Sequence, residues 1–155
     1  MAIIPGMRVV RSSIDGYGVV ATRDFAAGEV IAEVEGVLWH ESNPVDDKYS
    51  LLLGDGYFFD MVDQTRWINH SCDPNCEVDV GLSETGEMPA SGTPTPWARV
   101  YALRPLRAGD EITYDYAFSA EVAEPCRCGT KLCRGFIVDV DELHLLTGAA
   151  AAATG

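Results

Sequence analysis

The sequence predicts a mostly β domain built from many short strands. Apolar residues make up 47% of the 155 residues, which is enough for one domain with a buried core. The apolar runs are short, and glycine or proline interrupts them throughout the chain. No segment before residue 138 repeats its apolar residues at the 3.6-residue spacing of a long helix. A fold of several strands joined by turns is therefore expected.

The first half of the chain contains three expected strands. Residues 30–35 alternate with a period of two, which is typical of a half-exposed strand. Residues 49–53 and 57–59 lie on either side of Gly54-Asp55-Gly56, a sequence that favours a tight turn. These two segments are expected to pair as a hairpin.

The second half adds two strands and a long loop. Residues 98–103 form one strand candidate, and 111–113 form a short one after a turn at 107–110. Between them and the first half, residues 81–96 are dominated by glycine, serine, threonine, proline and acids, which predicts a loop. Residues 139–146 begin with acidic residues, which suit the N-terminal end of a helix, so a short helix is expected there.

The charge of the chain limits its partners. Lys and Arg number 11 against 24 Asp and Glu, which gives a net charge of −13. A chain this acidic is poorly suited to bind phosphate backbones or anionic membranes, so neither direct nucleic-acid binding nor membrane binding is expected. A basic partner would be attracted, although charge of this kind can also serve solubility alone. No secretory signal or membrane-spanning run is visible, so an intracellular location, cytoplasmic or nuclear, is expected.

The cysteines indicate a metal site rather than disulfides. Their number, five, is odd, and Cys126, Cys128 and Cys133 form a tight cluster. Three thiolates at this spacing suit a tetrahedral zinc ion that needs one more ligand. From the residues alone, that ligand could be Cys72, Cys76, His70 or His144.

Three further motifs are ambiguous when each is considered separately. Residues 66–76 are dense in polar groups, and they suit a turn as well as a binding site. Gly16-Tyr17-Gly18 allows close approach of a ligand to the backbone, but an ordinary β-turn has the same sequence. Tyr114 and Tyr116 are expected on one side of a strand, where they could also simply cover the core.

Taken together and in this order, the motifs resemble those of SET-domain protein lysine methyltransferases. The most specific part is Asn-His-Ser-Cys-x-Pro-Asn followed downstream by Asp-Tyr and the Cys-x-Cys cluster. The resemblance extends over about residues 7 to 138. The matching segments are residues 14–19, 27–29, 66–76, 108–116, 126–129 and 133–135.

The resemblance implies the fold and domain organisation of that family. The expected fold has several small β-sheets, a knotted C-terminal crossing and a zinc-binding cap, the post-SET segment. It divides this chain into a SET domain over residues 1–122, a post-SET zinc-binding segment over 123–138, and a short helix with a low-complexity tail over 139–155.

The resemblance also implies functional residues and two cofactors, S-adenosylmethionine and a structural zinc ion. Tyr116 matches the catalytic tyrosine, and Tyr49 and Tyr114 match residues beside the reacting groups. The expected zinc ligands are Cys72, Cys126, Cys128 and Cys133, which leaves out Cys76. The residues expected to bind S-adenosylmethionine are Gly16, Tyr17, Gly18, Tyr49, Arg66, Asn69 and His70.

The implied activity is methylation of a lysine in a basic protein, such as a histone, a histone-like protein or a ribosomal protein. A tyrosine at position 114 implies mono- or dimethylation rather than trimethylation. Two departures from the family pattern stand out: Val34 replaces a common tyrosine, and the connection between Asp60 and Arg66 is short. They leave open an alternative function, a non-catalytic SET-fold module that binds basic proteins. The sequence does not determine the oligomeric state.

Overall fold

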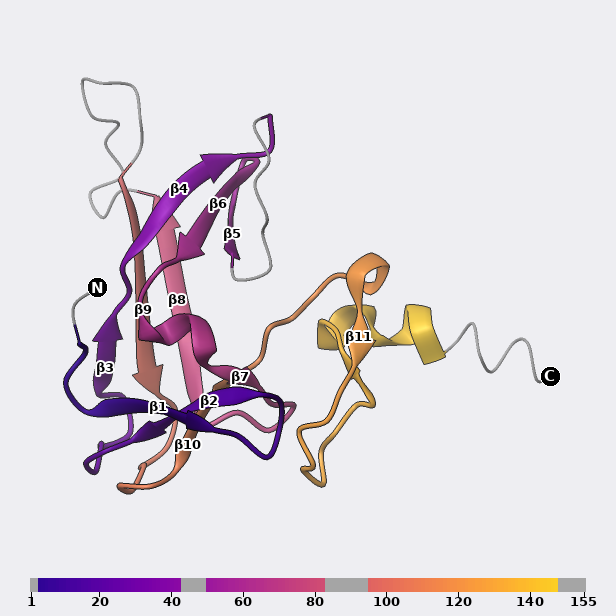
Figure 1. The fold of residues 1–155 in the computed structure, drawn as a ribbon. Coiled ribbons are helices and arrows are strands. Elements are labelled where there is room, and N and C mark those ends of the chain that lie inside the picture. Colours follow the sequence, from indigo (N-terminus) through magenta and orange to yellow (C-terminus); the bar gives the residue numbers. More distant parts are fainter. Residues whose placement is uncertain (1–2, 43–49, 83–94, 148–155) are drawn as a thin grey trace.

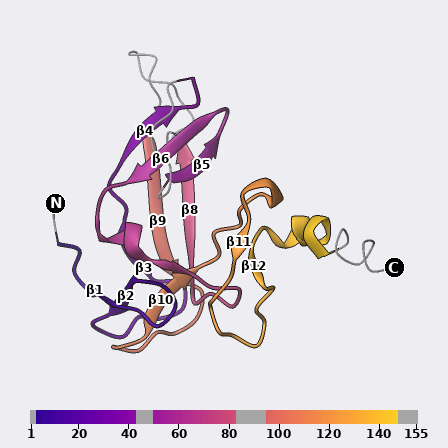
Figure 2. The same ribbon diagram turned by 45° about the vertical axis from the view of Figure 1, so that its right-hand side comes forward.

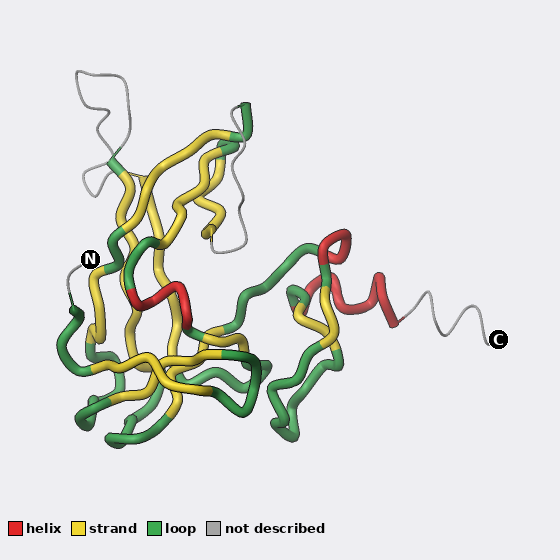
Figure 3. The backbone as a smooth tube through the Cα atoms, viewed as in Figure 1, coloured by secondary structure: helices red, strands yellow, loops and turns green. Residues whose placement is uncertain are grey.

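The computed structural model describes residues 3–42, 50–82 and 95–147. Three small sheets form the core, and a C-terminal segment extends to one side of them (Figure 1). The prediction of a mostly β fold is confirmed, because strands dominate the described residues and the helical parts are two short 3₁₀ turns and one short helical stretch over 140–147 (Figure 3). None of the helices in these residues is long and apolar enough to cross a bilayer.

The central sheet has the order β3-β9-β8. Strand β9 (Pro96–Ala102) lies between β3 (Val30–Glu33) and β8 (Cys76–Leu82) and is antiparallel to both. Every second side chain of β9 is buried from Ala98 onward, so one face of the sheet packs against the core. The predicted strands at residues 30–35 and 98–103 are therefore confirmed, with slightly different ends.

Strand β8 corrects one sequence prediction. Residues 81–96 were expected to form a loop, but Gly81 and Leu82 belong to β8 and Pro96 belongs to β9. Leu82 pairs with Pro96, so the ladder continues past the point where polar composition suggested a loop. The acids Glu77 and Asp79 of β8 alternate with apolar residues, a period-two signal that identifies a half-exposed strand. The rest of the predicted loop lies outside the described residues.

A second sheet joins the N-terminus to the middle of the chain. Its order is β1 (Met7–Arg11), β2 (Tyr17–Ala21), β10 (Glu111–Tyr114) and β7 (Asn69–His70). Strand β7 is only two residues long and runs parallel to β10. This pairing places the Asn-His pair beside the strand that leads into the tyrosines. The predicted strand at 111–113 is confirmed, whereas β1 and β2 were not predicted.

The third sheet has the order β4-β6-β5. Strands β5 (Ser50–Gly54) and β6 (Tyr57–Met61) form the predicted hairpin, and β4 (Gly36–His40), which was not predicted, pairs with the other edge of β6. The turn needs left-handed backbone at three successive residues: Gly54, Asp55 and Gly56 have φ values of 97°, 53° and 76°. Glycine and aspartate are among the residues that tolerate this conformation.

The C-terminal segment forms a small cap. It contains the 3₁₀ turn η2 (Ala120–Val122), the two-stranded pair β11 (Glu124–Pro125) and β12 (Phe136–Ile137), and the turn η3 (Val140–Glu142). Figure 2 shows β11 and β12 next to each other, beside the sheets of the core. The predicted short helix at 139–146 is confirmed, since η3 continues as a helical turn to residue 147. The tail after residue 147 lies outside the described residues.

Candidate functional site

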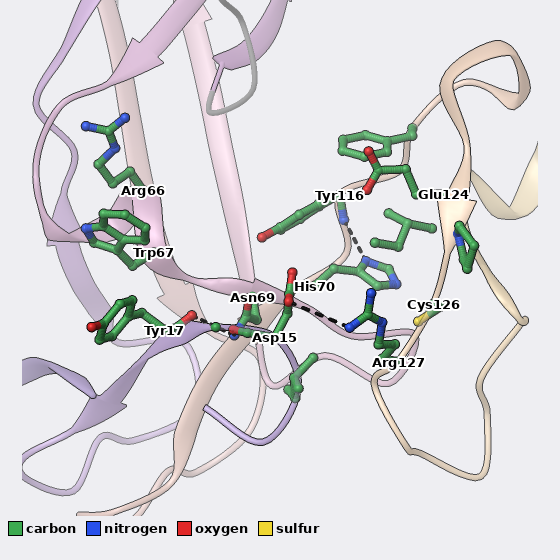
Figure 4. A pocket seen from close by; sticks show the side chains of 15 residues that line it. Asp15, Tyr17, Arg66, Trp67, Asn69, His70, Tyr116, Glu124, Cys126 and Arg127 are labelled. Atoms are coloured by element: carbon green, nitrogen blue, oxygen red, sulfur yellow. Dashed lines mark hydrogen bonds and ion pairs between the residues drawn. The ribbon is translucent and has the colours of Figure 1, made fainter. Parts of the chain in front are cut away.

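A cleft of about 430 Å³ lies between the core and the cap. Figure 4 shows Tyr17, Arg66 and Trp67 on the core side and Glu124 and Arg127 on the cap side. Three separate stretches of the core and two of the cap supply its walls. The lining residues are Ile14, Asp15, Gly16, Tyr17, Arg66, Trp67, Asn69, His70, Tyr116, Phe118, Glu124, Pro125, Cys126, Arg127 and Ile137.

Asn69 is held in a single orientation at the bottom of the cleft. Its side-chain nitrogen lies 3.2 Å from the Asp15 carbonyl oxygen, 3.0 Å from the Tyr17 carbonyl oxygen and 3.0 Å from Oε1 of Glu111. All three groups are acceptors, so only the NH₂ end of the amide can face them. The Oδ1 atom of Asn69 is therefore directed away from them, where it can accept a hydrogen bond from a ligand.

Of the two glycines in the Gly-Tyr-Gly motif, only Gly16 lines the cleft. Gly16 has a φ of 43°, and a Cβ added there would meet nothing within 4 Å. Gly18 lies in β2, where an added Cβ would stand 2.2 Å from Oε1 of Glu111. The structure thus gives different reasons for the two glycines: a left-handed turn at residue 16 and close packing against Glu111 at residue 18.

Arg66 and Trp67 reach the cleft from the 3₁₀ turn η1 (Gln64–Trp67). The buried carboxylate of Asp63 caps this turn by accepting hydrogen bonds from the backbone and side chain of Thr65. Its other oxygen accepts from the Glu35 backbone at 2.6 Å. The connection after Asp60 is short, but Asp63 fastens it to the residue that directly precedes β4.

His70 connects the cleft to the cysteine cluster. Burial lowers the pKa of His70 to about 4, against a smaller opposing effect of Asp115. The ring is therefore neutral, and the 3.4 Å approach of Asp115 Oδ1 to Nδ1 is not an ion pair. Nδ1 accepts from the Tyr116 backbone at 3.1 Å, which leaves the proton on Nε2, 3.4 Å from the Cys72 sulfur.

Three aromatic rings stand in a row, and two of them, Tyr116 and Phe118, line the cleft. The centroids of Tyr114 and Tyr116 are 4.9 Å apart, and those of Tyr116 and Phe118 are 5.4 Å apart. The Tyr116 hydroxyl donates to the Ile68 carbonyl at 2.6 Å. Burial raises the pKa of Tyr114 well above its ordinary value, so its hydroxyl stays neutral.

Four cysteine sulfurs form a cluster on the Nε2 side of His70. Those of Cys72, Cys126, Cys128 and Cys133 all lie within 4.8 Å of one another. Tetrahedral zinc with Zn–S bonds of about 2.3 Å separates its sulfurs by roughly 3.8 Å, so this spacing fits the ion.

The surroundings of the sulfurs also suit a metal-thiolate site. Backbone N–H groups of Arg134, Cys128 and Gly135 point at three of the sulfurs over 3.3–3.4 Å. Burial raises the pKa of the Cys72 thiol, so holding it as a thiolate calls for a cation nearby. The donor set and its surroundings therefore fit a structural zinc ion.

The other candidates for the fourth ligand lie elsewhere. Cys76 is buried in the apolar core, and burial raises its pKa to about 12. Among the described residues, the four-sulfur cluster includes none of Cys76, His144 and His70, although Nε2 of His70 lies 3.4 Å from the Cys72 sulfur. Tyr49 lies outside the described residues.

The cap is joined to the core by a half-buried ion pair. The Arg134 guanidinium lies 2.9 Å from Asp115 Oδ1 and donates to the Val138 carbonyl, also at 2.9 Å. A weaker contact crosses the open side of the cleft, where Arg127 approaches the Asp15 carboxylate at 4.0 Å (Figure 4). Both groups of this second pair are mostly exposed, so it contributes little to stability.

Sequence reasoning missed most of the cap side of the cleft. Phe118, Glu124 and Ile137 belong to segments with no polar motif of their own. Arg127 lies between two cysteines of the predicted zinc cluster, and nothing in that spacing indicates that its side chain lines a cleft. Trp67 carried a usable signal, because an aromatic residue inside a polar run is often partly buried beside a site.

The chain is similar to known proteins over most of its length. The SET domain model matches residues 16–117. Histone-lysine N-methyltransferase 2B of Homo sapiens is 36% identical over 146 residues, covering 83% of this chain but only 5% of the human protein. This chain thus corresponds to a small part of that relative.

Solved structures share the fold. Arabidopsis thaliana SUVH6 in complex with S-adenosylmethionine has a TM-score of 0.70 at 21% identity, over 84% of this chain and 33% of that one. KRYPTONITE in complex with DNA, an H3(1-15) peptide and S-adenosylhomocysteine has a TM-score of 0.68 at 24% identity, over 84% of this chain and 29% of that one. Because the SET match takes in more than half of the residues and the sheets follow the same fold, the chain belongs to the SET domain family.

Proposed function

We propose that this chain transfers a methyl group from S-adenosylmethionine to the side-chain amine of a lysine in a basic protein. The observation that carries the proposal is the cleft beside Tyr116, which brings Gly16 from one segment together with Arg66 and Asn69 from another. The name of the human relative and the ligands of the two neighbours in fold point the same way.

The core side of the cleft has groups suited to the methyl donor. Its volume of about 430 Å³ falls in the range of small-molecule sites. Arg66 would hold a carboxylate, Oδ1 of Asn69 would accept from an ammonium group, and the backbone at Gly16 would allow close approach. Bound S-adenosylmethionine would supply a methyl group on a positively charged sulfur: the carbon–sulfur bond would break as the carbon–nitrogen bond forms, S-adenosylhomocysteine would leave, and the proton lost beforehand by the amine would pass to solvent.

The aromatic end of the cleft suits the lysine amine. An ammonium ion, with a pKa near 10.4, has no lone pair, so the amine must first lose a proton. The apolar rings of Tyr114, Tyr116 and Phe118 favour the neutral form over the charged one. With its hydrogen directed to the Ile68 carbonyl, the Tyr116 oxygen can accept from an amine N–H and orient the nitrogen lone pair.

We assign residues 123–138 as the zinc-binding segment of this enzyme. With Cys72 as the fourth ligand, the zinc ion would join the cap to the strand that carries Asn69 and His70. Its role would be structural, because four protein sulfurs leave no open position for catalysis.

Methyl transfer can be tested directly with the purified chain. It would be incubated with radiolabelled S-adenosylmethionine and a panel of histones, histone tail peptides and ribosomal proteins. Wild type should label at least one basic protein, and Tyr116→Phe should lower kcat on the order of 10²-fold, because the amine loses its orienting oxygen. Tyr101→Phe is the matched control: its hydroxyl donates to Glu77 on an exposed sheet face, and its activity should match wild type.

The same experiment distinguishes the alternative of a non-catalytic binding module. A wild type that binds basic peptides but neither transfers label nor binds S-adenosylmethionine would overturn the enzyme proposal. Loss of labelling in Tyr101→Phe as well would show that tyrosine removal acts on the whole protein rather than on the cleft.

A further inference from the structure

We infer that Glu111 is the positioning residue that sets the shape of the cofactor side of the cleft, and that residue 18 is glycine in order to make room for it. The inference rests on the proposed function. It concerns a residue that does not line the cleft itself, so its effect must pass through other groups.

The first observation is that Glu111 ties together two walls of the cleft. Its Oε1 atom accepts from the Ser12 hydroxyl at 2.7 Å and from the Asn69 side chain at 3.0 Å. The Ser12 oxygen in turn accepts from the Ile14 backbone at 2.9 Å. Ile14 begins the stretch of lining residues that runs to Tyr17, so one carboxylate oxygen fixes both this loop and Asn69.

The second observation is the space that Glu111 occupies over Gly18. A Cβ on residue 18 would come to 2.2 Å from Oε1 and 3.0 Å from Cδ of Glu111, and to 3.0 Å from Cβ of Ser12. Gly18 is not among the glycines with positive φ, so the backbone itself accepts an alanine. Gly18→Ala would therefore push away the flexible end of Glu111 and break its hydrogen bonds, and Ser12 would have to shift by a few tenths of an ångström.

These contacts predict a specific coupling between the two positions. Gly18→Ala and Glu111→Ala remove the same hydrogen bonds by different routes, so each should weaken cofactor binding by about tenfold. In the double variant, the carboxylate that the added methyl group would displace is already absent. The double variant should therefore bind the cofactor about tenfold more weakly than wild type, rather than the hundredfold expected for two independent changes.

The probe is S-adenosylhomocysteine, with affinity measured by calorimetry on the full chain. Glu111→Gln keeps an oxygen that can accept from Ser12 and Asn69, so it should restore affinity to within about threefold of wild type. Glu33→Ala is the matched carboxylate control, because Glu33 is mostly exposed and pairs with Arg99 on the central sheet. The KM for the protein substrate should stay near the wild-type value in all five variants, and thermal unfolding checks that each one folds.

Each outcome decides the inference. Multiplicative effects of the two alanine changes, or wild-type affinity in Glu111→Ala, would overturn it. So would equal losses in Glu111→Gln and Glu111→Ala, because charge rather than hydrogen-bond geometry would then be responsible. A wild type that binds no S-adenosylhomocysteine would overturn the proposed function itself.

Discussion

Tyr114 and Tyr116 are only two residues apart, yet their surroundings differ. Tyr114 is 8% exposed and lies at the end of β10, whereas Tyr116 lies beyond the strand and lines the cleft. Because their ring centroids are 4.9 Å apart, the Tyr114 hydroxyl belongs to the same neighbourhood as the proposed amine site. Removing the Tyr114 hydroxyl would enlarge the space next to Tyr116. The hydrogen bond from the Tyr116 hydroxyl to the Ile68 carbonyl would remain.

Tyr114→Phe should therefore raise the degree of methylation. With wild type, mono- and dimethyl-lysine should dominate, because the hydroxyl occupies room that a methylated amine needs. The variant should convert more of its product to di- and trimethyl-lysine, as measured by mass spectrometry over a time course. Mainly trimethyl product from wild type would contradict this prediction, and Tyr101→Phe should leave the distribution unchanged.

His70 lines the cleft and also holds neighbouring groups in place. Its neutral ring accepts from the Tyr116 backbone on one side and faces the Cys72 sulfur on the other. Asp115 stands beside it and binds Arg134 of the cap. The backbone that carries Tyr116 is thus held by the same groups that hold the cap to the core.

At the level of elements, the cap is the least self-sufficient part of the fold. Its strands β11 and β12 are two residues each, and most of their side chains are exposed. A pair of strands this short cannot bury enough apolar surface to stabilise itself. The cysteine cluster, the Arg134–Asp115 pair and the Asp139 backbone bond to Phe118 at 2.7 Å connect it to the core.

The cap should therefore depend on the proposed zinc ion at the cysteine cluster. Metal analysis under reducing conditions should find about one zinc ion per chain, and Cys72→Ser should lose it. Since Glu124, Cys126 and Arg127 line the cleft, loss of zinc should also weaken binding of S-adenosylhomocysteine. Cys76→Ser is the matched control, because Cys76 is buried in the core and should leave the zinc content unchanged. Zinc retained in Cys72→Ser, or lost equally in both variants, would contradict the assignment.

The whole molecule carries a net charge of −13, which acts over longer distances than any single contact. A basic substrate would be attracted to it at low ionic strength. The screening length falls from about 30 Å at 0.01 M salt to about 3 Å at 1 M. Charge thus affects how often substrate and enzyme meet more than how the cleft is built.

Activity on a basic peptide should accordingly fall as salt rises. We expect kcat/KM to decrease at least severalfold between 20 and 500 mM sodium chloride, mostly through KM. Affinity for S-adenosylhomocysteine, measured by calorimetry at the same salt concentrations, should change much less. Salt-independent kcat/KM would show that the acidic surface serves solubility only.

The sequence by itself determined the sheet-rich fold, the hairpin around Asp55 and the cysteine cluster. Each of these follows from local chemistry: period-two alternation, left-handed turn residues and closely spaced thiols. The order of its motifs also indicated the family. Strands β1 and β4 were missed because short strands with few alternating side chains give little local signal.

Only the tertiary structure decided which residues meet. Pairing of β7 with β10, two segments more than 40 residues apart in the chain, brings Asn69 to Glu111 and His70 to Tyr116. The same folding places the cap wall of the cleft opposite Gly16 and leaves Gly18 beneath a carboxylate. Such contacts depend on how segments far apart in the sequence pack against each other. The spacing of residues along the chain does not specify which of these segments come together in space.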